Sequence, residues 1–339
     1  MKGWKLTKPL KLKLTDIDGG ACEQSNLSKV KITKALLTFS DLLRYTGEIS
    51  TDNVVLGSYG IGIVSQIDTN LFGLEKGLHV YVEPYRPCLE CFNCKNDEED
   101  KCSDIYTAGE DYDGFLSDFV EVDSSKLFIL PDSVSDTEAL FINHISLAIA
   151  IIEKLDIQKG EYVAVVGGNN FGNILSQLLI YHQAVPILVD NDPENIRIAQ
   201  DSGIYYTLGP DEVWNKEVSN ITGGRMAKHV VYISDSDIPV SKAFALASFN
   251  AGVVFTGTVT NTSAISFTQA VKKQLCIHCV NGAFGNTAAS INLIANKAID
   301  VSKLKINTAS YQDVPDVLKN MKDEYDSNEK FYETIIDQI

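Results

Sequence analysis

The feature that most constrains the fold is an alternation of strand-like and helix-like stretches between Pro131 and His278. Apolar residues at intervals of three and four predict a helix over 136–155. The alternation then continues with strands at 162–166, 186–189, 229–233, 252–257 and 274–278 and with helices over 171–181, after Pro193 and over 240–249. Such an order is typical of an α/β fold with a doubly wound parallel sheet.

The first 140 residues follow a different pattern, in which short apolar stretches at 30–33, 53–66 and 77–82 are punctuated by glycine and predict a β-rich domain. Helix-like stretches return at 287–298 and 314–324. A chain of 339 residues is long enough for two domains of ordinary size.

The charge balance excludes some functions. The chain has 29 Lys and Arg against 45 Asp and Glu, a net charge of −16, which argues against a nucleic-acid-binding face. The N-terminal stretch alternates Lys and Leu without the apolar core of a signal peptide. The most apolar run, 139–152, is shorter than the ~18 residues of a membrane span. We therefore expect a cytoplasmic protein that binds neither nucleic acid nor membrane.

Four of the seven cysteines form a cluster with the spacing Cys88-x2-Cys91-x2-Cys94-x7-Cys102. Thiolates at these intervals can surround one tetrahedral zinc ion, and four cysteines leave no open position, so the zinc would be structural. An iron–sulfur cluster is the rival, but its usual spacing ends C-x3-C-P. The other alternative is a set of reduced thiols without metal. The remaining cysteines, Cys22, Cys276 and Cys279, are expected to be free or buried thiols.

The turn after the first strand of the alternation resembles the dinucleotide fingerprint G-x-G-x-x-G. Gly167 and Gly172 occupy its first and third glycine positions, and Gly168 follows the first. Asn169 replaces the middle glycine; it tolerates left-handed backbone, but its side chain takes up room near a pyrophosphate. Asp190 ends the next strand, where an acid binds ribose hydroxyls and disfavours a 2′-phosphate. These residues predict an NAD(H) site; the alternative is a retained fold that no longer binds a cofactor.

Together these parts resemble the zinc-containing alcohol and polyol dehydrogenases of the medium-chain dehydrogenase/reductase superfamily. The resemblance runs almost end to end, over Lys2 to Leu14, Leu56-Gly57, the four-cysteine lobe at about 84–106, Gly114-Phe115, Pro131, Val166 to Gly172 and Asp190. It implies a GroES-like catalytic domain from 1–145 and 286–339, with a Rossmann domain from 146–285 inserted. It also implies a homodimer or a homotetramer.

The three positions that match the ligands of the family's catalytic zinc carry other residues. Thr38 replaces a cysteine, Ser58 replaces a histidine, and Asn143, with His144 beside it, stands at the third position. Zinc prefers thiolate, imidazole or carboxylate ligands, whereas Thr, Ser and Asn offer neutral oxygens. We therefore expect no ordinary catalytic zinc.

Some proton-handling groups of the family are kept. The resemblance implies that the Ser40 hydroxyl passes the substrate proton and that Asp41 supports the site from behind, but the next relay position is Leu43. Tyr59 replaces a family glutamate and is a candidate general acid, because a phenol can donate to a developing alkoxide. The alternative for Tyr59 is a packing role.

The leading hypothesis is an NAD(H)-dependent oxidoreductase that keeps a structural zinc. It would transfer hydride to or from a small carbonyl, alcohol or activated alkene without a catalytic zinc. One alternative is a catalytically inactive family member that acts as a binding or scaffold protein. Another is a zinc enzyme whose ligands lie elsewhere in the sequence.

Overall fold

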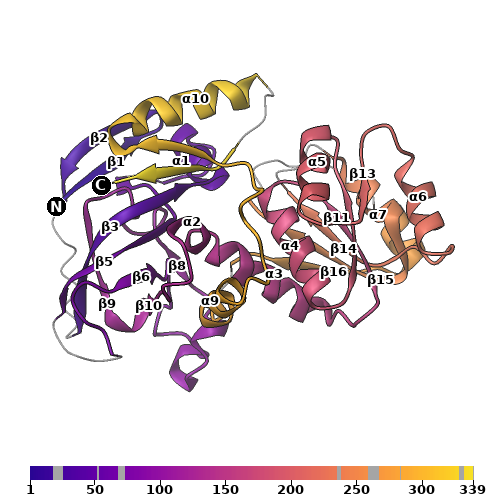
Figure 1. The fold of residues 1–339 in the computed structure, drawn as a ribbon, viewed down its shortest axis with the longest axis horizontal. Helices are drawn as coiled ribbons and strands as arrows, with labels where there is room; N and C mark the ends of the chain where they lie inside the picture. The colour runs from indigo at the N-terminus through magenta and orange to yellow at the C-terminus, as the bar shows by residue number, and fades with distance from the viewer. Residues whose placement is uncertain are drawn as a thin grey trace. The chain divides into compact units, whose positions relative to one another are not determined.

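The computed structural model describes residues 1–17, 26–51, 53–67, 73–234, 238–258, 267–282, 284–327 and 332–338. The chain divides into two compact units, one from Met1–Leu140 with Ile306–Ile339 and one from Phe141–Lys305 (Figure 1). The expected domain boundaries at 145/146 and 285/286 remain a prediction; the compact units change at 140/141 and 305/306.

The second unit is built on a six-stranded sheet. Its strands are β11 (Tyr162–Val166), β12 (Val185–Val189), β13 (Tyr206–Leu208), β14 (Ala227–Ile233), β15 (Ala247–Thr256) and β16 (Cys276–Val280). Every neighbouring pair is parallel, and the order is β13-β12-β11-β14-β15-β16. In chain order this is 3-2-1-4-5-6, the order of dinucleotide-binding folds. The predicted α/β class with a doubly wound parallel sheet is confirmed.

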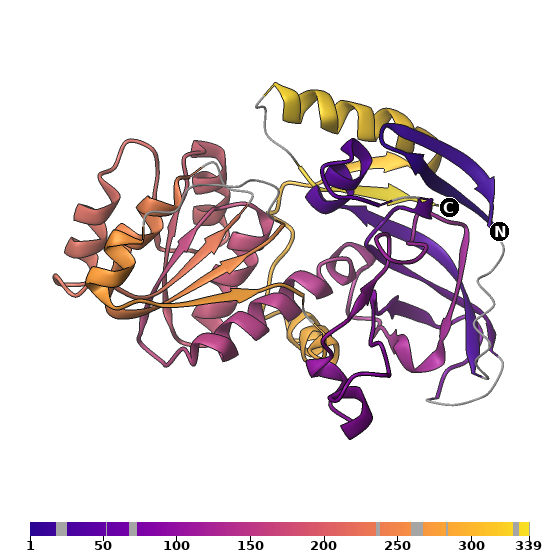
Figure 2. The same ribbon diagram turned by 180° about the vertical axis from the view of Figure 1, so that it is seen from behind.

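Helices cover this sheet on both sides (Figure 2). They are α3 (Ile142–Leu155), α4 (Asn170–Tyr181), α5 (Pro193–Asp201), α6 (Trp214–Ile221), α7 (Val240–Leu246) and α8 (Thr268–Lys273), and α9 (Thr287–Ala295) packs on α3. The central strands are buried on both faces, which explains their unbroken apolar runs, such as Val163 to Val166. The sheet core includes Ala164, Ile187, Val230 and Val253.

Two predicted helices differ from the structure. The stretch at 136–155 is broken into α2 (Asp136–Ala139) and α3 by the fully buried Leu140 and Phe141. The helix expected over 240–249 ends at Leu246, because Ala247 pairs with Ala227 and begins β15. Sheet pairing overrides the local helical pattern there.

The first unit is mainly β-structure. Its elements are β1 (Lys2–Lys8), β2 (Lys11–Asp16), β3 (Leu27–Leu37), α1 (Phe39–Thr46), β4 (Val54–Val55), β5 (Tyr59–Ile67), β6 (His79–Val82), β7 (Tyr85–Arg86), β8 (Tyr106–Thr107), β9 (Phe119–Asp123), β10 (Leu127–Ile129), α2, β17 (Asn307–Ser310), α10 (Val314–Asp326) and β18 (Thr334–Asp337). The main sheet has the order β10-β6-β5-β3-β18-β17, and β9 also pairs with β3. Strand β18, near the C-terminus, runs antiparallel to β3, so both ends of the chain contribute to this unit.

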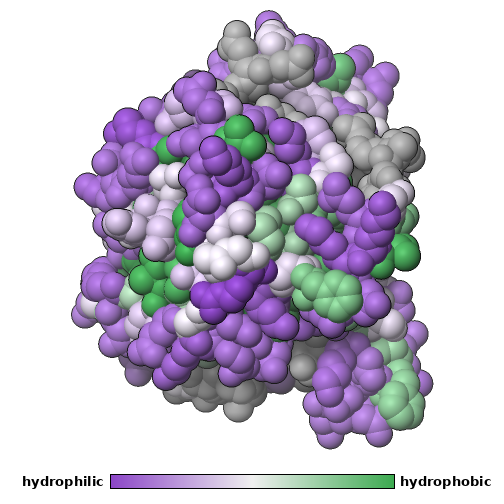
Figure 3. Space-filling model, turned by 90° about the vertical axis from the view of Figure 1, so that its right-hand side faces the viewer, coloured by the Kyte–Doolittle hydropathy of each residue, from purple (hydrophilic) through white to green (hydrophobic). Residues whose placement is uncertain are grey.

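Within the described ranges, no helix is both long and apolar enough to cross a bilayer. On the face drawn in Figure 3, hydrophilic residues predominate and apolar residues form small separate patches.

Candidate functional site

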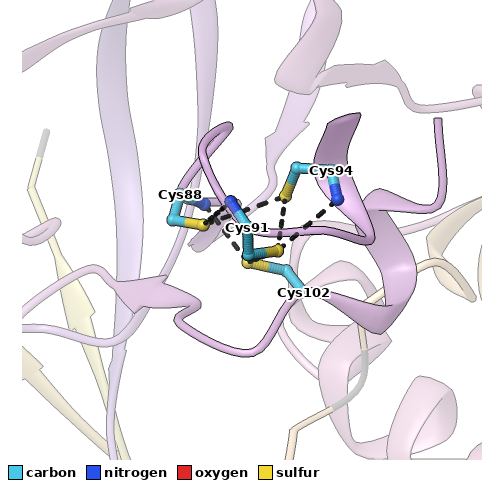
Figure 4. Close-up of side chains that lie close together, drawn as sticks. All are labelled: Cys88, Cys91, Cys94 and Cys102. Carbon is cyan, nitrogen blue, oxygen red and sulfur yellow. Dashed lines mark hydrogen bonds between the residues drawn. The ribbon is translucent and has the colours of Figure 1, made fainter. Parts of the chain in front are cut away.

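The four clustered cysteines converge in space. Their sulfur atoms all lie within 4.8 Å of one another (Figure 4). The Sγ–Sγ distances are 3.5 Å from Cys91 to Cys94, 4.0 Å from Cys88 to Cys94 and 4.0 Å from Cys91 to Cys102. Tetrahedral thiolates around zinc, with Zn–S bonds of about 2.3 Å, would lie about 3.8 Å apart. The four thiols therefore fit a closed structural zinc site.

Backbone amides support the sulfur atoms. The N–H groups of Cys91 and Cys94 donate to Cys88 Sγ and Cys91 Sγ, at 3.3 and 3.5 Å. The N–H of Cys88 donates to Cys102 Sγ at 3.3 Å. Backbone hydrogen bonds from Cys94 and Ser103 lower the pKa of Cys91 to about 5, whereas desolvation raises the pKa of Cys94. Such donors favour the thiolate that binds a metal.

No second cluster of potential metal ligands occurs in the described part of the chain. Cys276 and Cys279 are exposed in β16, as free thiols. Cys22 lies outside the described residues.

The glycine-rich turn joins β11 to α4, as the fingerprint predicts. Gly167 has a φ of 110°, which a glycine adopts without strain. A Cβ on Gly172 would lie 2.0 Å from the Gly167 carbonyl oxygen, so only glycine fits there. Both glycines are therefore required by the backbone of a close strand-to-helix turn.

Asn169 has a definite role in this turn. It is the N-cap of α4, with a φ of −61°, and its Oδ1 accepts a hydrogen bond from Gly172 N at 3.0 Å. Its side chain thus occupies one of the helix N-terminal N–H groups that would otherwise face an anion. Asn169, which departs from the fingerprint, therefore supplies a hydrogen-bond acceptor to Gly172 N that a bound phosphate would otherwise supply.

Asp190 follows β12 directly and is only 7% exposed. Its carboxylate accepts hydrogen bonds from Gly168 N, from Asp192 N at 2.6 Å and from Asn195 Nδ2 at 3.3 Å. Burial raises the pKa of Asp190, and the two backbone donors oppose this effect. A carboxylate has about four acceptor positions, so room for one more donor remains.

The residues at the family's zinc-ligand positions are tied into a hydrogen-bond network instead. Thr38 Oγ1 donates to Asp41 Oδ2 at 3.0 Å, and Ser58 Oγ donates to Asp41 Oδ1 at 3.2 Å. Asp41 also accepts from Thr38 N at 2.9 Å and Gly57 N at 3.1 Å, and it is fully buried. No thiolate or imidazole is present at Thr38 or Ser58, so these positions do not fit a catalytic zinc.

The third position lies in α3. Asn143 and His144 are both buried in the second unit. The ring of His144 lies 5.2 Å from that of Phe141 and 6.2 Å from that of Phe171. These aromatic contacts support a packing role for His144 in α3.

Ser40 and Tyr59 lie in the first unit, on α1 and at the start of β5, and both are half-buried. Desolvation raises the pKa of Tyr59 well above its usual range, and a hydrogen bond with Tyr85 adds to this. The Tyr59 phenol therefore keeps its proton at neutral pH. Leu43, at the family's relay position, is fully buried in the core, and its side chain has no proton that it could pass on.

Sequence reasoning missed two residues of this network. Arg44, on α1, is 4% exposed and donates from Nη1 to Ser58 Oγ at 3.1 Å. The same nitrogen lies 3.8 Å from Asp41 Oδ1, and Nη2 forms an ion pair with Glu110. The i,i+3 spacing of Asp41 and Arg44 was a signal for their pairing. The spacing gave no sign of Glu110, which is 66 residues away from Arg44.

Comparisons with known proteins agree with this fold. Residues 24–132 match the family model of the alcohol dehydrogenase GroES-like domain. The chain is 22% identical to an uncharacterized zinc-type alcohol dehydrogenase-like protein of Haemophilus influenzae, over 83% of this chain and 82% of that one. It is 24% identical to D-xylulose reductase A of Aspergillus oryzae, over 80% of this chain and 78% of that one.

Solved structures show the same fold over the whole chain. An alcohol dehydrogenase from Escherichia coli CFT073, complexed with NADH, is 20% identical with a TM-score of 0.86, and the match covers 100% of this chain and 99% of that one. Galactitol-1-phosphate dehydrogenase from Escherichia coli is 16% identical with a TM-score of 0.85, and each chain is covered completely. The predicted resemblance is confirmed: residues 24–132 match the GroES-like domain of alcohol dehydrogenases, the sequence is similar to zinc-type alcohol dehydrogenase-like and polyol dehydrogenase sequences, and the fold is that of the solved dehydrogenases.

Proposed function

We propose that this chain is an NAD(H)-dependent oxidoreductase that works on a small alcohol, carbonyl or activated alkene without a catalytic zinc. The observation that carries the proposal is the turn between β11 and α4, with Asp190 beside it. Gly167 and Gly172 keep the close backbone approach, and Asp190 follows the neighbouring strand. A neighbour of the same fold is a complex with NADH, which supports the choice of cofactor.

The residues around the turn favour NAD(H) over NADP(H). When bound, the nicotinamide would supply or accept the hydride. The Asp190 carboxylate would accept a hydrogen bond from a ribose hydroxyl, and its negative charge would repel a 2′-phosphate. The N-terminus of α4 would face the pyrophosphate, with one N–H group held by Asn169 unless that side chain turns away.

Residues of the first unit, Ser40 and Tyr59, would transfer the proton. The resemblance assigns a proton relay to Ser40, and Tyr59 keeps a phenolic proton that it can donate. An activated alkene needs less polarisation than an isolated carbonyl, which suits a site without a Lewis acid. Replacement Tyr59→Phe tests this role: turnover should fall at least about 100-fold, the lower end of the usual range for a lost general acid. Unchanged turnover would remove Tyr59 from the mechanism.

The deciding experiment is a titration of the purified protein with NADH, followed by cofactor fluorescence. Saturable binding below millimolar concentration is expected, with NADPH binding more weakly. In the variant Asp190→Asn, the affinities for NADH and NADPH should differ less than in the wild type. No binding at millimolar NADH would overturn the oxidoreductase proposal and leave the binding or scaffold function.

We also propose that the protein is a homo-oligomer, a homodimer or a homotetramer. In the six-stranded sheet, β16 is the last strand, and among the described residues it pairs with β15 alone. Its edge could pair with a second copy, and its residues Cys276, Ile277 and Cys279 are exposed.

A further inference from the structure

The strongest feature that the proposed function leaves unused is the buried guanidinium of Arg44. It reaches three partners that are far apart in the sequence: Asp41, Ser58 and Glu110. Asp41 is fully buried, Ser58 is 3% exposed, and the Glu110 side chain is 39% exposed. A positive charge is therefore held beside Ser58, one of the positions where the resemblance places a metal ligand.

A fixed cation at this position changes what the site can bind. Arg44 Nη1 lies 3.1 Å from Ser58 Oγ. A divalent ion bonded to that oxygen, at about 2–2.5 Å, would lie beside the guanidinium and be repelled by it. Arg44 also neutralises Asp41, which would otherwise be an unpaired charge in the core. The charge of Asp41 is thus balanced without a metal.

We propose that Arg44 takes the place of the metal: it is a fixed internal cation that positions Asp41 and Ser58 and excludes a divalent ion from this site. The inference deepens the zinc-free function proposed above, but it rests on contacts within the first unit alone. It does not depend on cofactor binding.

The arrangement also limits the chemistry of the two hydroxyl groups. The Thr38 and Ser58 hydroxyl hydrogens both point to Asp41. Neither hydrogen remains to polarise a substrate oxygen. A substrate oxygen would therefore need a donor other than these two hydroxyl groups.

The first test is the metal content of the whole protein, measured by elemental analysis after exposure to excess zinc and gel filtration. We expect one zinc per chain, and nearly none in Cys102→Ser. A second zinc in the wild type that is lost in Asp41→Asn or Ser58→Ala would overturn the proposal. This readout needs neither substrate nor NADH, so a failed cofactor titration would leave its result unaffected.

The second test is a double-mutant cycle on the thermal midpoint. Arg44→Gln should lower the midpoint on the order of 10 °C, because Asp41 loses its counter-ion. Asp41→Asn in that background should recover part of the loss, which a purely steric role of Arg44 would not allow. Additive losses would overturn the counter-ion role.

Two further variants keep the cycle interpretable. Arg197→Gln removes an exposed arginine with two ion pairs and should change the midpoint by no more than about 2 °C. If Arg44→Gln does not fold, Arg44→Lys keeps the charge but cannot bridge Ser58 and Glu110 together. The thermal midpoint of Arg44→Lys should then lie below that of the wild type. A midpoint equal to that of the wild type would contradict the bridging geometry.

Discussion

At the scale of single residues, Thr38 and Ser58 decide that this site is unlike a zinc alcohol dehydrogenase. The absence of zinc ligands at these two positions could be predicted from the sequence, because neutral oxygens are poor zinc ligands. The role of Arg44 at this site could not be predicted. Arg44 meets Ser58 and Glu110 only after α1, β5 and the loop around Glu110 have folded together.

Asn169 is the residue that most affects the proposed cofactor site. In Asn169→Gly the N-cap loses its side-chain acceptor, which costs only a few tenths of a kcal/mol because glycine is itself a fair N-cap. The Gly172 N–H then becomes available to a pyrophosphate. We expect tighter NADH binding at nearly unchanged stability, measured by fluorescence titration and by urea unfolding.

The matched control is Asn169→Asp. An aspartate keeps the acceptor and the shape of the cap, so stability should not fall. Its negative charge would face the pyrophosphate, so NADH binding should weaken. Weaker binding in Asn169→Gly than in the wild type would contradict the idea that this side chain competes with the phosphate.

At the scale of elements, the cysteine lobe depends on its metal more than on a core. The short helices at Cys94–Asn96 and Glu99–Lys101 have no core of their own: Phe92 is 79% exposed and Leu89 is 52% exposed. In Cys102→Ser we expect zinc to fall from about one per chain to near zero and proteases to cleave within 84–106.

The control for this prediction is Cys276→Ser, which changes an exposed thiol outside the cluster. It should keep the full zinc content and the wild-type pattern of proteolysis. Loss of zinc in this variant, or its retention in Cys102→Ser, would argue against the four-cysteine site.

A pair of titratable groups joins β14 to the residue just before β11. His229 Nε2 lies 2.9 Å from Glu161 Oε2, and His229 is 5% exposed. Burial lowers the pKa of His229, and Glu161 only partly offsets this effect. Below about pH 6.5 the unfolded chain therefore binds a proton that the folded protein resists.

This linkage predicts that the free energy of unfolding decreases as the pH falls from 7 towards 5. One such group gives a slope of at most ~1.4 kcal/mol per pH unit. Urea unfolding of His229→Gln should show a flatter pH dependence than the wild type. Equal slopes for His229→Gln and the wild type would refute the prediction.

Predictions for elements succeeded where the local pattern and the fold agree. The strand at 162–166 and the helix at 314–324 were found nearly as expected, as β11 and α10. The stretch 247–249 was expected to be helical, but pairing with β14 made it a strand. The hairpin of β1 and β2 was not predicted, although the alternation of Lys and Leu in this stretch is a strand pattern.

At the scale of the whole molecule, β16 leaves one edge of the sheet open to a second copy. Replacing Ile277, which is 36% exposed on this strand, with lysine should place a charge at the proposed interface. Light scattering after gel filtration should show a dimer or a tetramer for the wild type and smaller particles for Ile277→Lys. Val271→Lys, at a 73% exposed position on α8, is the control and should leave the assembly unchanged. A monomeric wild type would disprove the proposal.

The sequence by itself determined the chemistry of short segments: the spacing of four thiols, the glycines of a strand-to-helix turn and the acid after the second strand. These signals are local, since each depends on residues that stay close along the chain. Tertiary structure alone decided how distant residues meet. It brought the sulfur atoms to within 4.8 Å of one another and placed Arg44 beside Ser58 and Glu110. Long-range contacts of this kind depend on the packing of whole elements, which no local pattern records.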